Sequence, residues 1–171
     1  MDATKKIAVV QGPGPVVQVL FRTLAERWQG EARVVGAIAE DHGLPDRACT
    51  AGYLRSLADG ARYPIFQDLG RGSQACHLAG DGAVDAAAAV AKDIETGCDL
   101  VILSKFGKLE AGGGGLREAF AAAIEAGVPV LTTVAASQAE RWQMFAAPLF
   151  MPVAADAAEI EAWWLGVRAK A

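Results

Sequence analysis

Ser104 and Lys105 stand at the end of an apolar segment, where the chain turns into a loop that carries glycine and lysine. The stretch 99–110 reads Asp-Leu-Val-Ile-Leu-Ser-Lys-Phe-Gly-Lys-Leu-Glu. A continuous apolar run of this kind is typical of a strand buried on both faces of a parallel sheet. In nucleotide-hydrolysing α/β proteins, an acidic group that serves Mg²⁺ is expected at the end of such a strand. Because a hydroxyl and a cation stand here instead, the pattern favours a site for an anion.

Two further cations, Lys108 and Arg117, flank four consecutive glycines at 112–115. Ordering four glycines is costly in conformational entropy, so this loop is expected either to close over something or to stay mobile. Backbone N–H groups exposed by glycine, together with three nearby cations, form a reasonable cradle for phosphate or another oxyanion. A flexible surface loop with solvated charges is the alternative interpretation.

A second candidate anion site is the turn Gly12-Pro-Gly-Pro15, which lies between a strand and a helix. The free N–H groups of a helix N-terminus, here those of residues 12–16, favour an anion. A P-loop would need Gly-x-x-x-x-Gly-Lys-Ser/Thr, with the lysine on the phosphates and the hydroxyl on Mg²⁺. Val16, Val17 and Gln18 supply neither group. A tight strand-to-helix turn without a ligand is the other interpretation.

The periodicity of apolar residues predicts the elements that position these loops. Buried strands are expected at 6–11, 33–39, 99–103 and 128–134, and two short paired strands at 53–57 and 63–67. Helices are expected at about 15–28, 82–97 and 116–127. Capping-box signatures at Ser137 with Glu140, and at Asp156 with Glu159, predict two more helices.

This alternation predicts one α/β domain over residues 1–171: a three-layer, mostly parallel sheet with helices on both faces. The stretch 40–80 is interpreted as a less regular insertion. Ligands of open parallel sheets bind beyond the carboxyl ends of the strands, so segments 11–15, 104–115 and 132–137 are expected to converge on one crevice. Accessory candidates for a wall of this crevice are Asp68, Arg71 and Ser73.

Composition excludes several classes of protein. With 171 residues, of which 53% are hydrophobic and 21% charged, the chain is long enough for one globular core. A net charge of −4 gives no general attraction for nucleic acid. No apolar run approaches the ~20 residues that a membrane-spanning helix needs. The first residues carry no cleavage signal, so a cytoplasmic location is expected.

The three cysteines are too sparse for a disulfide framework. Zinc ligands could be sought among His42, Cys49, Cys76 and His77. Their spacings match no standard zinc pattern, so no structural metal is expected. No residue is assigned a catalytic role.

The chain resembles a bacterial family known as domain of unknown function 2478. The resemblance is carried by Leu57-Ala-Asp-Gly60, Gln67-Asp-Leu-Gly-Arg-Gly-Ser-Gln-Ala-Cys76, Ser104-Lys-Phe-Gly-Lys-Leu-Glu110, Gly115-Leu-Arg117 and Gly127-Val-Pro-Val-Leu131. These segments spread over almost the whole chain. Members of that family are typically encoded beside molybdate-transport genes, so the resemblance implies a role in molybdenum handling without defining a reaction.

More distantly, the layout is similar to a P-loop nucleoside-triphosphatase family, which has Asp-Glu-Ile-Gly-Lys-Met-Glu where this chain has Ser104 to Glu110. The resemblance implies a P-loop-NTPase-like fold. Here Ser104 and Lys105 replace both acidic residues, and the helix after Gly14 lacks the phosphate-binding lysine. Phosphoryl transfer depends on a metal and positioned cations, so these departures argue against hydrolysis.

The sequence therefore predicts a P-loop-NTPase-like binding protein with degenerate phosphate-binding motifs, accessory to molybdenum uptake or homeostasis. Its expected ligand is a nucleotide phosphate or an oxyanion such as molybdate. The residues assigned to this site are Gly12, Gly14, Val16, Ser104, Lys105, Lys108 and Arg117.

Two alternatives stay open. One is a Mg²⁺-dependent nucleoside-triphosphatase or kinase that recruits Asp68, Asp81 or Glu110 for the metal. The other is an assembly or regulatory factor for molybdenum proteins, with an exposed Trp163-Trp164 region as its interface. Self-association of the chain is left open as well.

Overall fold

Seven strands form one mixed sheet in the computed structural model, which describes residues 4–45, 51–65 and 80–170. Their order across the sheet is β4-β3-β2-β5-β6-β1-β7. The strands are β1 (Ile7–Gln11), β2 (Val34–Asp41), β3 (Ala51–Ser56), β4 (Arg62–Pro64), β5 (Leu100–Leu103), β6 (Val130–Thr132) and β7 (Phe150–Ala154). The helices are α1 (Gly14–Trp28), α2 (Gly80–Glu95), α3 (Lys108–Ala111), α4 (Arg117–Ala126), α5 (Ala139–Ala146) and α6 (Ala157–Arg168).

The prediction of a mostly parallel sheet is confirmed. Strands β2, β5, β6, β1 and β7 run parallel to one another. The antiparallel part is the pair β3 and β4, which extends the sheet beyond β2. This pair is the predicted two-strand unit of the 40–80 stretch, joined by a turn in which Gly60 has a φ of 79°. Residues 66 and 67, predicted to continue the second of these strands, lie outside the described residues.

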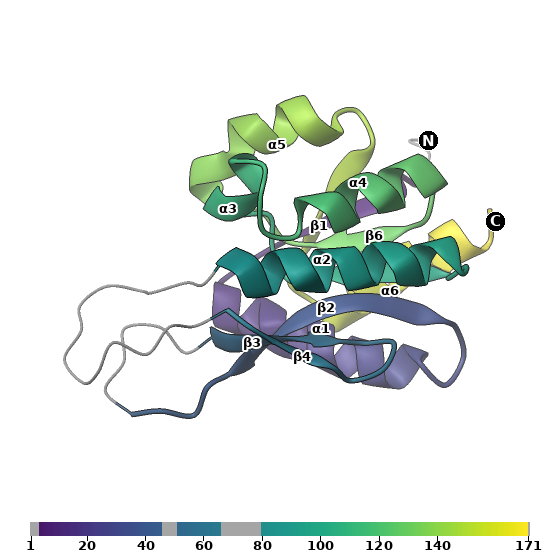
Figure 1. The fold of residues 1–171 in the computed structure, drawn as a ribbon. Helices are drawn as coiled ribbons and strands as arrows, with labels where there is room; N and C mark the ends of the chain where they lie inside the picture. Colours follow the sequence, from purple (N-terminus) through teal and green to yellow (C-terminus); the bar gives the residue numbers. More distant parts are fainter. Residues whose placement is uncertain (1–3, 46–50, 66–79, 171) are drawn as a thin grey trace.

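Helices cover both faces of the sheet, as the three-layer prediction requires (Figure 1). On one face α1 and α6 pack against side chains such as Ala8, Val10 and Ile102. On the other face α2, α4 and α5 pack against Val9, Val101 and Leu103, among others. Every residue of β5 is buried, because neighbouring positions of this strand serve opposite faces.

Two elements were not predicted, and one predicted cap is wrong. Strand β7 lies at the sheet edge, and of its residues only Val153 is buried, so it lacks a continuous apolar run. Helix α3 has four residues, too few to show a helical period.

The Ser137 capping box does not form: a 3₁₀ turn spans Ala136–Gln138, and α5 begins after it without a side-chain cap.

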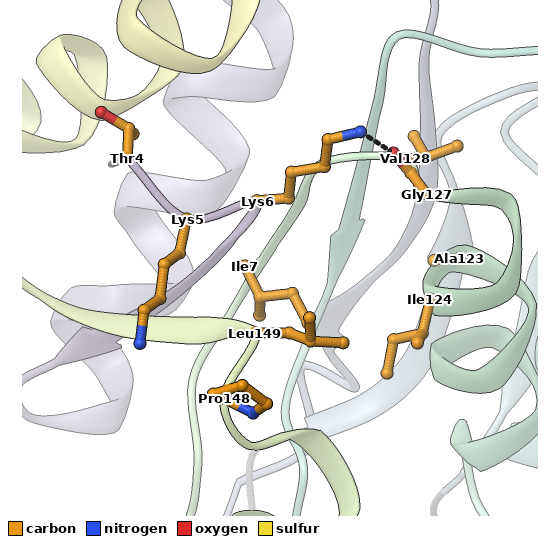
Figure 2. A pocket seen from close by; sticks show the side chains of 10 residues that line it. All are labelled: Thr4, Lys5, Lys6, Ile7, Ala123, Ile124, Gly127, Val128, Pro148 and Leu149. Carbon is orange, nitrogen blue, oxygen red and sulfur yellow. Dashed lines mark hydrogen bonds between the residues drawn. The ribbon is translucent and has the colours of Figure 1, made fainter. Parts of the chain in front are cut away.

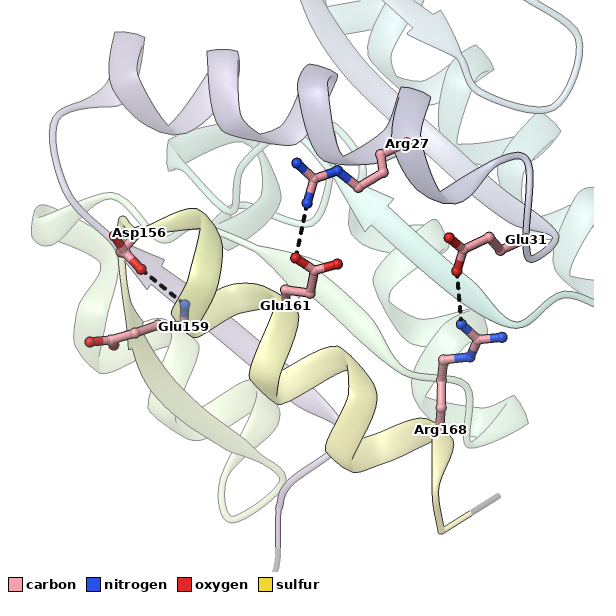
Figure 3. Close-up of polar contacts among 6 residues, drawn as sticks. All are labelled: Arg27, Glu31, Asp156, Glu159, Glu161 and Arg168. Carbon is pink, nitrogen blue, oxygen red and sulfur yellow. Dashed lines mark hydrogen bonds and ion pairs between the residues drawn. The ribbon is translucent and has the colours of Figure 1, made fainter.

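The second predicted cap is confirmed and holds the start of α6. The Asp156 carboxylate accepts a hydrogen bond of 3.0 Å from the Glu159 backbone N–H (Figure 3). Figure 3 also shows two ion pairs between α1 or the residues after it and α6: Arg27 with Glu161 at 2.9 Å, and Glu31 with Arg168 at 3.5 Å. Exposed pairs of this kind contribute little, so α6 is held mainly by its buried side.

Trp163 and Trp164 form much of that buried side of α6. Their side chains are 4% and 1% exposed, and Trp164 packs on Trp28 with ring centroids 5.7 Å apart. The hypothesis that this tryptophan pair forms an exposed interface is therefore wrong. The helical spacing of these residues reflects packing on the sheet.

Replacing the cap residue of α6 tests this local arrangement. Asp156→Ala leaves the Glu159 N–H without its acceptor and is expected to lower the free energy of unfolding by about 1 kcal/mol. Asp156→Asn keeps an accepting oxygen and serves as the control. Urea denaturation monitored by circular dichroism measures both, and equal losses for the two variants would contradict the capping role.

Candidate functional site

The carboxyl ends of β1, β5 and β6 lie side by side, as predicted for segments 11–15, 104–115 and 132–137. The Thr133 hydroxyl donates to the Val10 carbonyl at 2.7 Å, and the Thr132 hydroxyl donates to the Leu103 carbonyl at 2.8 Å. The Phe106 N–H donates to the Thr133 carbonyl at 2.8 Å. Short hydrogen bonds therefore join the three strand ends, and the crevice beyond them stays a prediction.

A neutral side-chain pair occupies the place where a metal-binding carboxylate would be expected. The Gln18 amide donates to the Ser104 carbonyl at 2.9 Å, and the Ser104 hydroxyl donates to the Gln18 side-chain oxygen at 3.2 Å. Ser104 is 8% exposed, so this contact is shielded from water. Mg²⁺ prefers carboxylates and phosphate oxygens, and neither residue offers one. The pair instead fixes the first turns of α1 beside the residue that precedes Lys105.

The N-terminus of α1 has no side-chain cap. Pro13 is the N-cap residue, and the first intrahelical bond runs from the Val17 N–H to the Pro13 carbonyl at 3.1 Å. The N–H groups of Gly14 and Val16 precede this bond, Pro15 has none, and all three residues are exposed. Uncapped amides at the positive end of a helix dipole are suited to an anion.

Gly12 is required by a close approach rather than by a ligand. A Cβ at this position would come within 2.7 Å of the Ala155 Cβ, which belongs to the residue after β7. The turn before α1 is therefore held against the end of the edge strand.

Lys105 and Lys108 are exposed cations that form no ion pair in the part of the chain that the structure describes. The Lys105 side chain lies over Gly107: a Cβ on Gly107 would be 3.0 Å from Lys105 Cε and 3.9 Å from its Nζ. The Lys105 ammonium is thus placed next to the loop that follows β5.

The same loop encloses a buried carboxylate, that of Glu110. Its two oxygens accept the N–H groups of Gly107 at 2.8 Å and of Leu116 at 2.9 Å. Glu110 is 7% exposed. Gly115 has a φ of 55°, and a Cβ there would lie 1.7 Å from the Glu110 Oε2, so only glycine fits. Because both oxygens are occupied by the loop, Glu110 is not free to hold Mg²⁺.

The glycine run folds back on the short helix α3. The N–H groups of Gly112, Gly113 and Gly114 donate to the carbonyls of Lys108, Glu110 and Leu109 at 3.1, 3.1 and 2.9 Å. These three amides therefore do not form the cradle for an external anion that was predicted for this loop. Backbone hydrogen bonds to α3 therefore order this run.

Arg117 takes part in the same loop. Its guanidinium donates to the Glu110 carbonyl at 3.1 Å and lies 4.7 Å from the centre of the Phe145 ring. This half-buried cation is directed toward α5, unlike the exposed Lys105 and Lys108.

Asp81 lies exposed in the first turn of α2. Asp68, Arg71 and Ser73 lie outside the described residues, as do Cys49, Cys76 and His77.

Sequence reasoning missed Gln18 as a partner of Ser104 and Glu110 as the centre of its loop. Gln18 falls four residues after Gly14, on the first turns of the predicted helix, which is the one signal that could have placed it near the strand ends.

Within the described ranges, no group of three or more His, Cys, Asp and Glu side chains is placed to hold a metal ion. No helix in these ranges is long and apolar enough to cross a bilayer.

Comparison with known proteins adds a family and a relative. The profile of a family described as "Protein of unknown function (DUF2478)" matches residues 7–163. The chain is 33% identical over 165 residues to a protein of Bradyrhizobium diazoefficiens named Molybdenum import ATP-binding protein ModC 2. The match covers 96% of this chain but 18% of that protein, so the chain spans less than a fifth of its relative's length. No solved structure matches the chain.

Removal of the Glu110 carboxylate tests whether the loop depends on an internal anion. Glu110→Ala leaves two buried N–H groups without acceptors and is expected to cost at least about 2 kcal/mol of unfolding free energy. Formate, a small carboxylate, is expected to restore part of this loss in a concentration-dependent way by binding to the same amides. Thermal denaturation with formate and with chloride of equal ionic strength measures the effect.

Glu118→Ala is the matched control, because Glu118 is an exposed carboxylate in the first turn of α4. This variant should show neither the loss nor the rescue. A Glu110→Ala protein as stable as the parent would show that the loop does not depend on the carboxylate.

Proposed function

The chain belongs to this DUF2478 family, and we propose that it is a P-loop-NTPase-like domain that binds a small oxyanion or a nucleotide phosphate without hydrolysing it. The proposed site lies between the N-terminus of α1 and the residues that follow β5. Gly12, Gly14 and Val16 contribute the helix turn, and Ser104, Lys105 and Lys108 contribute the facing loop.

The observation that carries this proposal is the Gln18–Ser104 pair. It holds α1 against the end of β5 through a hydrogen bond of 2.9 Å, which supports a site that combines the uncapped helix amides with Lys105. Helix amides and a lysine ammonium recognise tetrahedral oxyanions by the same charge-assisted hydrogen bonds, whether the anion is phosphate or molybdate. Arg117 is a less direct contributor, since it is already engaged by Phe145 and the Glu110 carbonyl.

The same pair argues against metal-dependent hydrolysis. Phosphoryl transfer requires Mg²⁺ held by the protein and a cation on the transferred phosphate. In the described residues, the neutral pair replaces the expected metal carboxylate and Glu110 is occupied by backbone amides. A hydrolase or kinase, the alternative function, would have to draw its metal ligands from residues such as Asp81 or Asp68.

The link to molybdenum is supported by the relative's name. A protein called a molybdenum import ATP-binding protein contains a segment 33% identical to nearly the whole of this chain. We propose that the domain serves molybdenum uptake or homeostasis as an accessory to such import. Since the match covers a small part of that protein, the ATP-binding activity in its name is not transferred to this chain.

Titration calorimetry of the Lys105→Ala variant tests the site. Molybdate, tungstate, ATP and GTP are titrated without Mg²⁺, and at least one is expected to bind one site per chain. Loss of the charge-assisted contact should weaken that binding by about tenfold or more. Lys92→Ala, an exposed lysine in the last turn of α2, is the matched control and should bind as the parent does.

Absence of binding for all four anions would refute the proposed function. Phosphate release from ATP or GTP that requires Mg²⁺ and is lost in Lys105→Ala would establish the hydrolase alternative in its place.

A carboxylate introduced at the helix N-terminus tests the role of the α1 amides separately. Nothing lies within 4 Å of a Cβ at Gly14, so Gly14→Asp is sterically accepted. The new charge favours the helix dipole, so the melting temperature should hold or rise while anion affinity falls about tenfold or more. Gly14→Asn has the same shape without the charge and should retain more affinity. Equal affinities of the two variants would place the anion elsewhere.

A further inference from the structure

Two cavities adjoin at the edge of the sheet opposite the proposed oxyanion site, where the parallel strands begin. The first, of about 280 Å³, lies between the start of β1, the end of α4 and the residues before β7. The second, of about 380 Å³, lies between the start of β5 and the end of α6. Lys6, Gly127 and Val128 line both cavities, so they meet along this short boundary.

The first cavity is mainly apolar. Its lining includes Ile7 and Leu149, which Figure 2 shows opposite Ile124 of α4, together with Pro148 and Val128. Leu149 is 47% exposed, so the cavity opens to solvent beside an apolar side chain. A volume near the lower end of the usual range for ligand sites, about 300–1,000 Å³, suits a small ligand with an apolar body.

A positive charge lies at the boundary between the cavities. The Lys6 ammonium donates to the Gly127 carbonyl at 2.7 Å (Figure 2). No carboxylate lies within ion-pair distance of Lys6 in the described part of the chain. The carbonyl offers an oxygen but no full negative charge, so the ammonium retains two donors and its charge for another partner.

The second cavity adds cations to this boundary. Arg168, which is also paired with Glu31 at 3.5 Å, and Lys170 line it with Lys6 near the end of α6. Its lining holds these three cations and one acidic residue, Asp99, which accepts the Arg33 backbone N–H at 2.8 Å. The polar side of the cavity pair therefore favours an anionic group, whereas the first cavity favours a hydrocarbon.

We propose that this cavity pair is a binding site for a small amphiphilic carboxylate. The alkyl or aryl body occupies the first cavity between Ile7, Ile124 and Leu149, and the carboxylate accepts from Lys6 on the side of Arg168 and Lys170. The site is separate from the proposed oxyanion site, because the two lie at opposite ends of the parallel strands. An inorganic oxyanion has no apolar body and would leave the first cavity unfilled.

Titration calorimetry with octanoate, below the concentration at which it forms micelles, tests the proposal. Octanoate is expected to bind one site per chain, and acetate and octanol, which lack the chain or the charge, are expected to bind at least about tenfold more weakly. Lys6→Met keeps the apolar stem and should weaken octanoate about tenfold, whereas the control Lys92→Met should leave it unchanged.

Two further variants separate cavity filling from charge. Ile124→Trp fills the first cavity and should abolish octanoate binding. Leu149 is at an exposed position that tolerates a polar residue. Leu149→Asp places a charge that repels the carboxylate at the mouth of the cavity, so it should abolish octanoate binding as well. Molybdate should not compete with octanoate. The proposal is overturned if octanoate does not bind, binds at many sites, binds no better than octanol, is displaced by molybdate, or ignores Lys6→Met and Leu149→Asp.

Discussion

The loop after β5 depends on one buried carboxylate. A charged group removed from water is costly unless hydrogen bonds replace its hydration, and Glu110 obtains them from the backbone of Gly107 and Leu116. The loop must therefore curl around the carboxylate, and Gly115 has to be glycine because a Cβ would collide with it. This arrangement sets the start of α4 and holds Arg117 against Phe145. It also leaves Lys105 and Lys108 on the outside of the loop as exposed cations.

The chemistry of the strand ends follows from neutral groups in buried positions. Ser104, Thr132 and Thr133 are all buried, and each hydroxyl donates to a neutral oxygen of a neighbouring element. A carboxylate in the place of Ser104 would need a metal or a cation to compensate its burial. With serine and Gln18 satisfying each other, the strand ends pack without one. The residues at the start of α1 and Lys105, in contrast, are exposed to solvent.

The two edges of the sheet differ in what they offer a ligand. At the carboxyl edge, the uncapped α1 amides and the Lys105 and Lys108 side chains are exposed, and groups of this kind suit a compact inorganic anion or a phosphate. At the amino edge, α4 ends in carbonyl groups, one of which, that of Gly127, is bonded to Lys6, and the adjoining cavity is mainly apolar. The chain, which is 33% identical to a segment of a protein named as a molybdenum import ATP-binding protein, thus presents two chemically distinct surfaces at opposite ends of its strands.

Elements with strong local patterns could be predicted from the sequence. The apolar runs of β1, β2 and β5, the β3–β4 turn at Gly60, the helices α1, α2 and α4 and the Asp156 cap could all be predicted, because their signals lie within a few neighbouring residues. Edge strand β7 and four-residue α3 could not, since half-exposed or very short segments carry no clear period.

The partners of the candidate site residues depend on contacts between distant parts of the chain. Gln18 and Ser104 are 86 positions apart and meet only because β5 lies two strands from β1 in the sheet. Trp163 and Trp164 are buried because α6 packs over the sheet next to α1, in the same core cluster as Trp28. The amides of the glycine run, predicted to cradle an external anion, bond instead to backbone carbonyls of α3, and the Glu110 carboxylate takes its hydrogen bonds from Gly107 and Leu116 on either side of the run. A sequence pattern shows where backbone amides are available. Whether they bond to a carbonyl, to a carboxylate of the same chain or to an external anion depends on the path of the backbone in space.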